Sequence, residues 1–251
     1  MHIVHSGDPI QTDMELGAEI ERRFQLAQEK RRAEGRNPYT RGSLASLRDL
    51  RFDADGLTLT VGQTDYGKFI GSAYPDLAER YGIEQLHLSV AICNFVTTTD
   101  DVAVFHIRGE IAYPRHFHEI GGMLPFMMDG VHVHPFDAMI HEDVTELGVR
   151  PDEITSMILL GVANDMNPER LNNEIVLTTK IGITARELID RHATLPAAGR
   201  TEGDLILMKH APETVADFLT RRAEIFVPTG WAGALLYGWH TFGPDWMPTE
   251  E

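Results

Sequence analysis

Two glutamates in the middle of the chain, Glu142 and Glu146, have the spacing best suited to chemistry. They lie in the segment 136–147 (FDAMIHEDVTEL), where apolar residues recur every three or four positions and predict a helix. Residues four apart share one face of a helix, so the two carboxylates should lie side by side. A hard divalent cation such as Mg²⁺ relieves their repulsion and also binds phosphate oxygens. An ordinary solvated helix face has the same pattern, so the residues around the pair must decide between the two interpretations.

Histidines gather around the same region, and alternating pairs of them could also do chemistry. In an extended segment, His116 and His118 share one face, as do His132 and His134. Imidazole suits Zn²⁺, Fe²⁺, Ni²⁺ or Cu²⁺ better than Mg²⁺, and it can also donate to phosphate. Loop or surface histidines are the alternative. Arg115 stands beside the first pair and could bind a phosphate, or lie on the surface as most arginines do.

The predicted elements around these residues alternate between strands and helices without the regular strand-helix-strand repeat of a doubly wound fold. An amphipathic helix is predicted over 12–34, and a short one over 75–81. Strand-like segments and helical segments follow in an order that predicts an α/β sandwich with a mixed sheet and an N-terminal extension. The expected strands are 47–53, 57–62, 87–96, 102–109, a short one ending at Gly121-Gly122, 154–163, 173–181 and 203–209, and the further helices are 136–147, 185–192, 212–222 and a last one reaching about residue 240.

Composition narrows the function classes. The net charge of −16 disfavours binding to nucleic acid or to an anionic membrane, and a bound metal would be needed to hold an anionic substrate. The single cysteine, Cys93, lies in an apolar run and is expected to be a buried, inert thiol. No apolar run is long enough for a membrane span, and the N-terminus lacks the pattern of a signal peptide, so a cytoplasmic protein is expected. The N-terminal helix and the acidic surface suggest a homodimer.

The segment from Gly121 to Val149 resembles the signature box of the Nudix hydrolases. Gly121-Gly122 match the double glycine that opens the box, Glu142 and Glu146 match two of its helical glutamates, and Gly148-Val149 match its close. His141 stands where the family has arginine, Thr145 where it has another glutamate, and the interval from Gly122 to His141 is five residues longer than in the family pattern. The resemblance implies a metal held by Glu142, Glu146 and the Gly121 carbonyl, with Mg²⁺ expected and Mn²⁺ as an option.

A wider likeness indicates one branch of that family. The segment LTLTVGQTDYGKFIGSAY, with Tyr66 near its centre, is similar to the stretch that precedes the Nudix domain in animal-type UDP-sugar diphosphatases. Glu174 begins the second strand after the box, where the resemblance implies a catalytic base or a further metal ligand. An N-terminal extension over 1–84 and a Nudix-like domain over 85–251 are therefore expected.

Three functions remain open at this point. The first is metal-dependent hydrolysis of a nucleoside diphosphate linked to another group, most simply a UDP-sugar, with Glu142, Glu146 and Glu174 as catalytic residues and Arg115, His116, His118 and Tyr66 as substrate-binding residues. The second is a binding or regulatory protein that keeps the fold without catalysis. The third is a metalloenzyme that uses the histidine-rich insertion to hold a transition metal.

Overall fold

The computed structural model describes residues 1–6, 10–54, 56–109, 115–167, 170–196 and 203–246 of the chain. The chain divides into two compact units, each built from segments distant in the sequence. Unit 1 contains Met1–Ala91, Met123–His134 and Asn164–Asn173, and unit 2 contains Ile92–Gly122, Pro135–Ala163 and Glu174–Glu251. The division predicted between residues 84 and 85 stays a prediction.

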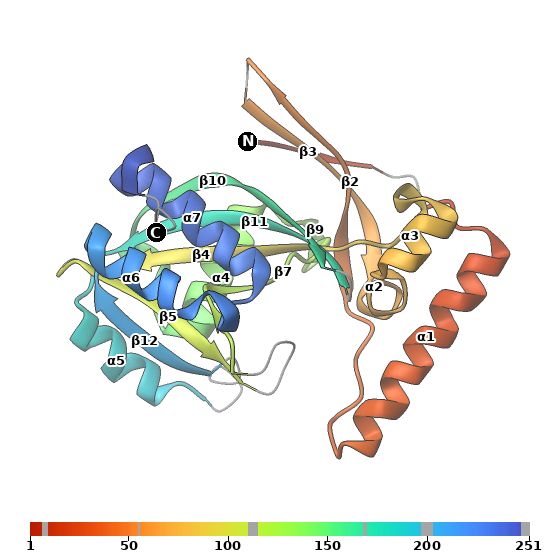
Figure 1. The fold of residues 1–251 in the computed structure, drawn as a ribbon, viewed down its shortest axis with the longest axis horizontal. Helices are drawn as coiled ribbons and strands as arrows, with labels where there is room; N and C mark the ends of the chain where they lie inside the picture. The colour runs from red at the N-terminus through yellow and green to blue at the C-terminus, as the bar shows by residue number, and fades with distance from the viewer. Residues whose placement is uncertain (7–9, 55, 110–114, 168–169, 197–202, 247–251) are drawn as a thin grey trace. The chain divides into compact units, whose positions relative to one another are not determined.

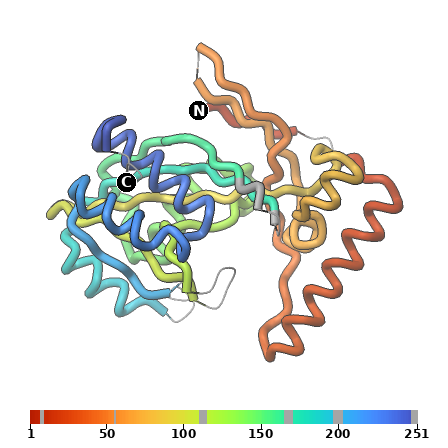
Figure 2. The backbone as a smooth tube through the Cα atoms, in the orientation of Figure 1, coloured from red at the N-terminus to blue at the C-terminus, as the bar shows by residue number. Residues whose placement is uncertain are grey.

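Unit 1 combines a three-stranded sheet with three helices (Figures 1 and 2). Strand β3 lies in the middle of this sheet, parallel to β1 and antiparallel to β2, with which it forms a long hairpin. Helix α1 packs on α2 and α3 through a cluster that includes Leu16, Ile20 and Phe24, as its predicted apolar stripe requires. The elements are β1 (His2–His5), α1 (Met14–Ala33), β2 (Ser43–Asp53), β3 (Gly56–Asp65), α2 (Tyr66–Ser72), α3 (Pro75–Tyr81), β8 (Met127–Met128) and β9 (Val131–His132).

The second sheet has, among the described residues, the strand order β10-β11-β4-β5-β12, with β6 beside β5 and β7 beside β4. Strand β5 is antiparallel to β4, β6 and β12. The strands are β4 (Val90–Thr97), β5 (Val102–Arg108), β6 (Phe117–His118), β7 (Ile120–Met123), β10 (Ile154–Asn167), β11 (Arg170–Ile181) and β12 (Gly203–Lys209), and the helices are α4 (Pro135–Leu147), α5 (Ala185–Thr194), α6 (Pro212–Arg222) and α7 (Pro228–Phe242).

Helices cover both faces of this sheet in unit 2. Successive side chains of a strand point to opposite faces, and in β4 Cys93 and Phe95 pack in the cluster formed with α6 and α7. Asn94, between them, points the other way and bonds to Asp143 of α4. Helix α4 therefore lies on the face opposite α6 and α7 (Figure 1). The predicted α/β sandwich with a mixed sheet is confirmed.

Most predicted elements are confirmed with small shifts at their ends. The predicted helices 75–81 and 212–222 coincide with α3 and α6, and the predicted strand 203–209 coincides with β12. Cys93 is fully buried, and burial raises the pKa of its thiol, as expected for an inert structural cysteine. No helix within the described ranges has the length and apolar character needed to cross a membrane.

Candidate functional site

The double glycine of β7 lies directly against the helix that carries the glutamate pair. A Cβ atom added at Gly122 would stand 2.7 Å from Oε1 of Glu142, so any other residue there would displace that carboxylate. At Gly121 an added Cβ would collide with the backbone carbonyl of Ile92 in β4. The double glycine thus permits two close approaches, one between neighbouring strands and one between strand and helix. The sequence predicted that the glycines and the helix belong together, and the structure brings Glu142 to Gly122.

Helix α4 buries a face that the apolar pattern did not anticipate. Met139 and Leu147 are fully buried as expected, but Asp143 is buried with them, and Glu146 is only 9% exposed. The helix ends at Gly148, whose φ of +71° is the left-handed conformation common after a helix. Glu146 therefore lies in largely dry surroundings, one turn after Glu142.

Asp143 and Asn94 form a buried pair that the sequence did not reveal. The Asn94 side-chain amide donates to both carboxylate oxygens of Asp143, at 2.9 and 3.0 Å, and neither residue is exposed. Burial raises the pKa of Asp143 to about 7, against the effect of the Asn94 hydrogen bond, and the nearby charge of Glu142 adds to the rise. The pair fixes the rotation of α4 on the sheet, and with it the direction of Glu142 and Glu146.

A second buried cluster of ionisable groups is centred on His118. Nε2 of His118 lies 3.4 Å from Oε1 of Glu174, and Nδ1 of His118 lies 2.7 Å from the backbone oxygen of Glu119. Burial disfavours the charged form of both groups, but the attraction between the two groups is stronger than this effect. The pKa of His118 is therefore raised and the pKa of Glu174 is lowered. His118 and Glu174 therefore form an ion pair in the interior of unit 2.

Glu119 belongs to the same cluster, and the sequence suggested it only as a carboxylate that could replace a lost metal ligand. Its carboxyl group is completely buried, and no described residue hydrogen-bonds to either of its oxygens. Nδ1 of His118 lies 3.8 Å away, and an added Cβ at Gly230, in the first turn of α7, would stand 2.6 Å from Oε2. Burial raises the pKa of Glu119 to about 8, so this group is mainly a neutral acid at pH 7.

The remaining candidate residues lie in different surroundings. His116 is half-buried. Arg115 is exposed, has a φ of +64°, and donates its backbone N–H to the backbone oxygen of Arg108 at 2.9 Å. Tyr66 begins α2 in unit 1, where its ring lies 5.4 Å from that of Tyr39. His106, which is buried, stacks near His118 with ring centroids 5.9 Å apart. Arg115, His116 and Tyr66 keep their substrate-binding roles as proposals.

A metal in this region would have few side-chain ligands. Within the described residues, no group of three or more His, Cys, Asp or Glu side chains is arranged to hold a metal ion. That gives no support to a histidine cage for a transition metal in the described part of the chain. Mg²⁺ needs less from a protein, because it binds through one or two carboxylates and completes its shell with waters and substrate phosphates. Glu142 and Glu146 fit that requirement, and the backbone carbonyl of Gly121 is the proposed third donor.

Comparison with known proteins gives structural likenesses only. No family model matches the chain, and no curated protein matches it. Among solved structures, a NUDIX hydrolase from Nitrosomonas europaea aligns over 65% of this chain and 97% of its own, with 11% identity and a TM-score of 0.43. The MutT protein from Methanosarcina mazei Go1 aligns over 61% and 94%, with 11% identity and a TM-score of 0.42. Shewanella oneidensis NrtR aligns over 60% of this chain and 61% of its own, with 10% identity and a TM-score of 0.40.

These likenesses do not assign an activity to the chain, since every TM-score is below 0.5 and every identity is near one-tenth. The functional conclusion has to come from the residues of unit 2. The relevant features of unit 2 are the glutamate pair on α4, the double glycine of β7 and the buried cluster around His118.

Proposed function

We propose that the chain is a Nudix-type hydrolase that uses a divalent metal to cleave a nucleoside diphosphate derivative, with a UDP-sugar as the model substrate. The observation that carries the proposal is the approach of Glu142 to Gly122, with Glu146 following one turn later on the largely buried side of α4. Two hard carboxylates one turn apart, beside the double glycine, provide oxygen donors for a divalent cation.

In this proposal Glu142, Glu146 and the Gly121 carbonyl hold Mg²⁺, or Mn²⁺ in its place. When bound, the metal supplies the positive charge that neutralises the diphosphate. The overall charge of −16 makes such local neutralisation necessary, because the surface otherwise repels an anionic substrate. The Asn94–Asp143 pair positions Glu142 and Glu146 by fixing α4 against the sheet, and it does not itself bind the metal.

Glu174 serves in this proposal as the base or as a further metal ligand. Its carboxylate is kept ionised by His118, and ionised is the form that accepts a proton or binds a cation. Arg115 and His116 are proposed to contact substrate phosphates. His118 is buried, with one ring nitrogen facing Glu174 and the other facing the backbone oxygen of Glu119, so its proposed role is to hold Glu174. The substrate-binding role of Tyr66, which lies in unit 1, stays a prediction. From the sequence, we still expect a cytoplasmic homodimer. We also expect it to have no affinity for nucleic acid or membranes.

The test is release of UMP from UDP-glucose with Mg²⁺ or Mn²⁺. Wild-type protein is expected to release UMP, and Glu142→Gln and Glu146→Gln are expected to remove most of the activity while the fold is retained. Asp137→Asn is a matched control, because Asp137 is an exposed carboxylate on the same helix. Absence of turnover for a panel of nucleoside diphosphate derivatives with both metals would overturn the proposal.

One observation favours a second candidate, a Nudix-like protein that binds nucleotides without cleaving them. Thr145 stands where the resemblance implies a glutamate, and its hydroxyl donates to the backbone oxygen of His141 at 2.9 Å. That position therefore offers no carboxylate to a metal. A rise in the melting temperature with UDP-glucose, without release of UMP under any metal condition, would support this candidate over the hydrolase.

A further inference from the structure

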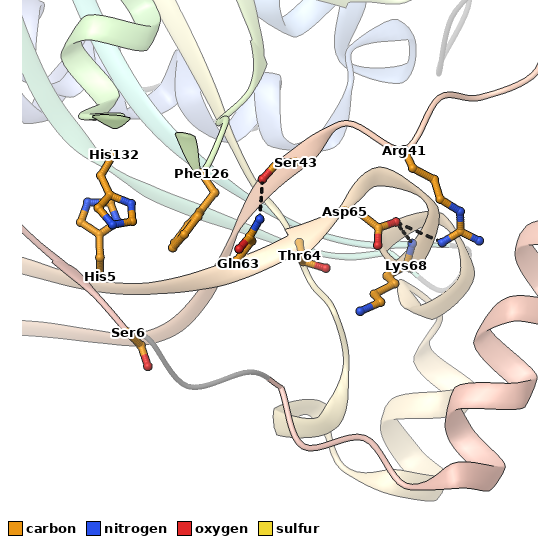
Figure 3. A pocket seen from close by; sticks show the side chains of 10 residues that line it. All are labelled: His5, Ser6, Arg41, Ser43, Gln63, Thr64, Asp65, Lys68, Phe126 and His132. Carbon is orange, nitrogen blue, oxygen red and sulfur yellow. Dashed lines mark hydrogen bonds and ion pairs between the residues drawn. The ribbon is translucent and has the colours of Figure 1, made fainter. Parts of the chain in front are cut away.

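Unit 1 contains a cavity of about 510 Å³, which is lined by residues of β1, β2, β3, α2 and β9 together with Ser6, Arg41 and Phe126 (Figure 3). None of these lining residues belongs to the set proposed for hydrolysis. Small-molecule sites commonly have volumes of roughly 300–1,000 Å³. The side chains in Figure 3 divide the cavity into a ring-lined end, a polar middle and a cationic end.

The ring-lined end is formed by His5 of β1, His132 of β9 and Phe126. The two imidazoles stack with centroids 4.0 Å apart and an interplanar angle of 19°, and the Phe126 ring meets both of them edge-on. Burial lowers the pKa of His5, and the neighbouring His132 and His134 lower it further, so His5 is neutral near pH 7. Nδ1 of His5 is buried, and no described residue hydrogen-bonds to it. This end therefore offers aromatic ring surface to a ligand.

The cationic end is formed by Lys68 of α2, beside Arg41 and Asp65. Arg41 is neutralised by two carboxylates, Glu21 at 2.5 Å and Asp65 at 3.3 Å. Lys68 forms no ion pair with any described residue, and its ammonium group points back toward the middle of the cavity (Figure 3). The positive charge is thus available to an anion.

The middle of the cavity carries short polar groups from β2 and β3. The Gln63 side-chain amide donates to Oγ of Ser43 at 3.1 Å, and the Gln63 side chain is otherwise exposed. Thr64 lines the same stretch, next along β3, but its hydroxyl is buried against His87, so the polar groups open to a ligand are those of Gln63 and Ser43. Amide and hydroxyl groups of this kind can both donate and accept hydrogen bonds, which suits the hydroxyl groups of a sugar.

We propose that this cavity is a second small-molecule site, which binds a nucleoside monophosphate. The base packs on the ring-lined end, the ribose lies along Ser43 and Gln63, and the phosphate pairs with Lys68. A nucleoside monophosphate has its planar base at one end, its ribose hydroxyl groups in the middle and its anionic phosphate at the other end. The matching side chains follow one another along the cavity in the same order. The site is distinct in its residues from the hydrolase proposal and does not depend on it.

Isothermal titration with AMP and UMP tests the site, with adenosine and inorganic phosphate as partial ligands. Both nucleotides are expected to bind. Adenosine and inorganic phosphate are expected to bind at least tenfold more weakly, because each of these partial ligands contacts only one end of the cavity. Lys68→Met and His5→Leu are expected to weaken nucleotide binding at least tenfold. Lys30→Met is the matched control, since Lys30 is an exposed lysine of unit 1 outside the cavity, and it should bind as wild type does.

Lys68 is exposed, so its replacement should leave the fold intact, and a melting curve checks this for both variants. The imidazole NMR signals of His5 are expected to shift when AMP is added. Retained UDP-glucose hydrolysis in Lys68→Met, with nucleotide binding lost, separates this site from the hydrolase site. Equal nucleotide binding by wild type and Lys68→Met, or no binding of either nucleotide to wild type, overturns the proposal.

Discussion

The Asn94 side chain donates to both carboxylate oxygens of Asp143, and this contact joins the central strand β4 to helix α4 within unit 2. Asp143 immediately follows Glu142 and lies one turn before Leu147, so holding it fixes how the helix is turned. The pair is fully buried, and the pKa of Asp143 is raised to about 7, first by burial. Both the stability of α4 and its response to pH should therefore depend on this contact.

We predict that the stability due to Asp143 falls as pH rises. The folded protein holds this proton up to about pH 7, whereas the unfolded chain releases it near 3.8, so the folded state binds more protons between these values. The free energy of unfolding should decrease over pH 4–7 by up to about 4 kcal/mol relative to a variant without the acid. Urea unfolding of wild type and Asp143→Asn across this range measures the difference. A constant difference between the two proteins would contradict the prediction.

We also predict that Asn94→Ala destabilises unit 2 more at pH 8 than at pH 5. At pH 8 the Asp143 carboxylate is mainly ionised and would lose its hydrogen bonds in a dry environment, at a cost of about 3 kcal/mol. At pH 5 the acid is neutral and the cost is smaller. The double variant Asn94→Leu/Asp143→Leu should recover much of the loss, because no buried charge remains. An equal cost at both pH values would show that the carboxylate is not the group affected.

The His118–Glu174 ion pair should contribute to stability only while both partners are present. Replacing His118 by Leu leaves a carboxylate that is 2% exposed without its cation, at a cost of about 3–5 kcal/mol. His118→Leu/Glu174→Leu should be less destabilised than His118→Leu alone. Chemical denaturation of wild type, His118→Leu, Glu174→Leu and the double variant measures the coupling, with exposed His141→Ala as a control. A double variant no more stable than the single one would contradict the pairing.

The sequence predicts the framework of the site better than its interior. Apolar periodicity located α4 to within one residue, and the turn TTTDD located the hairpin of β4 and β5. Asn94 stands inside the apolar run SVAICNFV, and its partner is 49 residues away, so no local pattern joins them. Asp143 lies among charged neighbours and is typical of a solvated face by type. Its burial follows from the packing of α4 on the sheet, which is a tertiary effect.

Other elements escaped prediction for local reasons. Helix α2, which has the sequence YGKFIGS, contains two glycines and spans seven residues. That length is too short to show a helical period. Strands β8 and β9 have two residues each, below the length at which alternation can be recognised. Glu119 could be suggested from the sequence as a spare carboxylate near the double glycine, but its burial could not. Its complete burial depends on α7, which lies more than one hundred residues later.

Gly122→Ala should impair hydrolysis by displacing Glu142 while leaving the fold intact. The added Cβ would stand 2.7 Å from Oε1 of Glu142, which is the far end of a flexible side chain and can move. A shift of about 1 Å in such a group can cost roughly 100-fold in rate. UMP release and the Mn²⁺ affinity of the variant measure the effect, and Gly17→Ala is the control because its Cβ would meet open space. Unchanged rate and metal affinity would remove Glu142 from the site.

His87 should make unit 1 sensitive to acid. It is 5% exposed and lies between two hydroxyl groups, with Nδ1 3.0 Å from Oγ1 of Thr64 and Nε2 3.2 Å from Oγ1 of Thr12. Burial, with the charges of Lys68 and Arg48, lowers its pKa to about 4, whereas the unfolded chain titrates near 6.5. The unfolded state therefore binds more protons between these values, and the stability due to neutral His87 is complete above pH 6.5 and is lost as pH falls toward 4. The loss amounts to about 3 kcal/mol at most. His87→Gln should lack this slope, which acid titration of unfolding free energies detects, and an NMR-measured His87 pKa near 6.5 would refute the prediction.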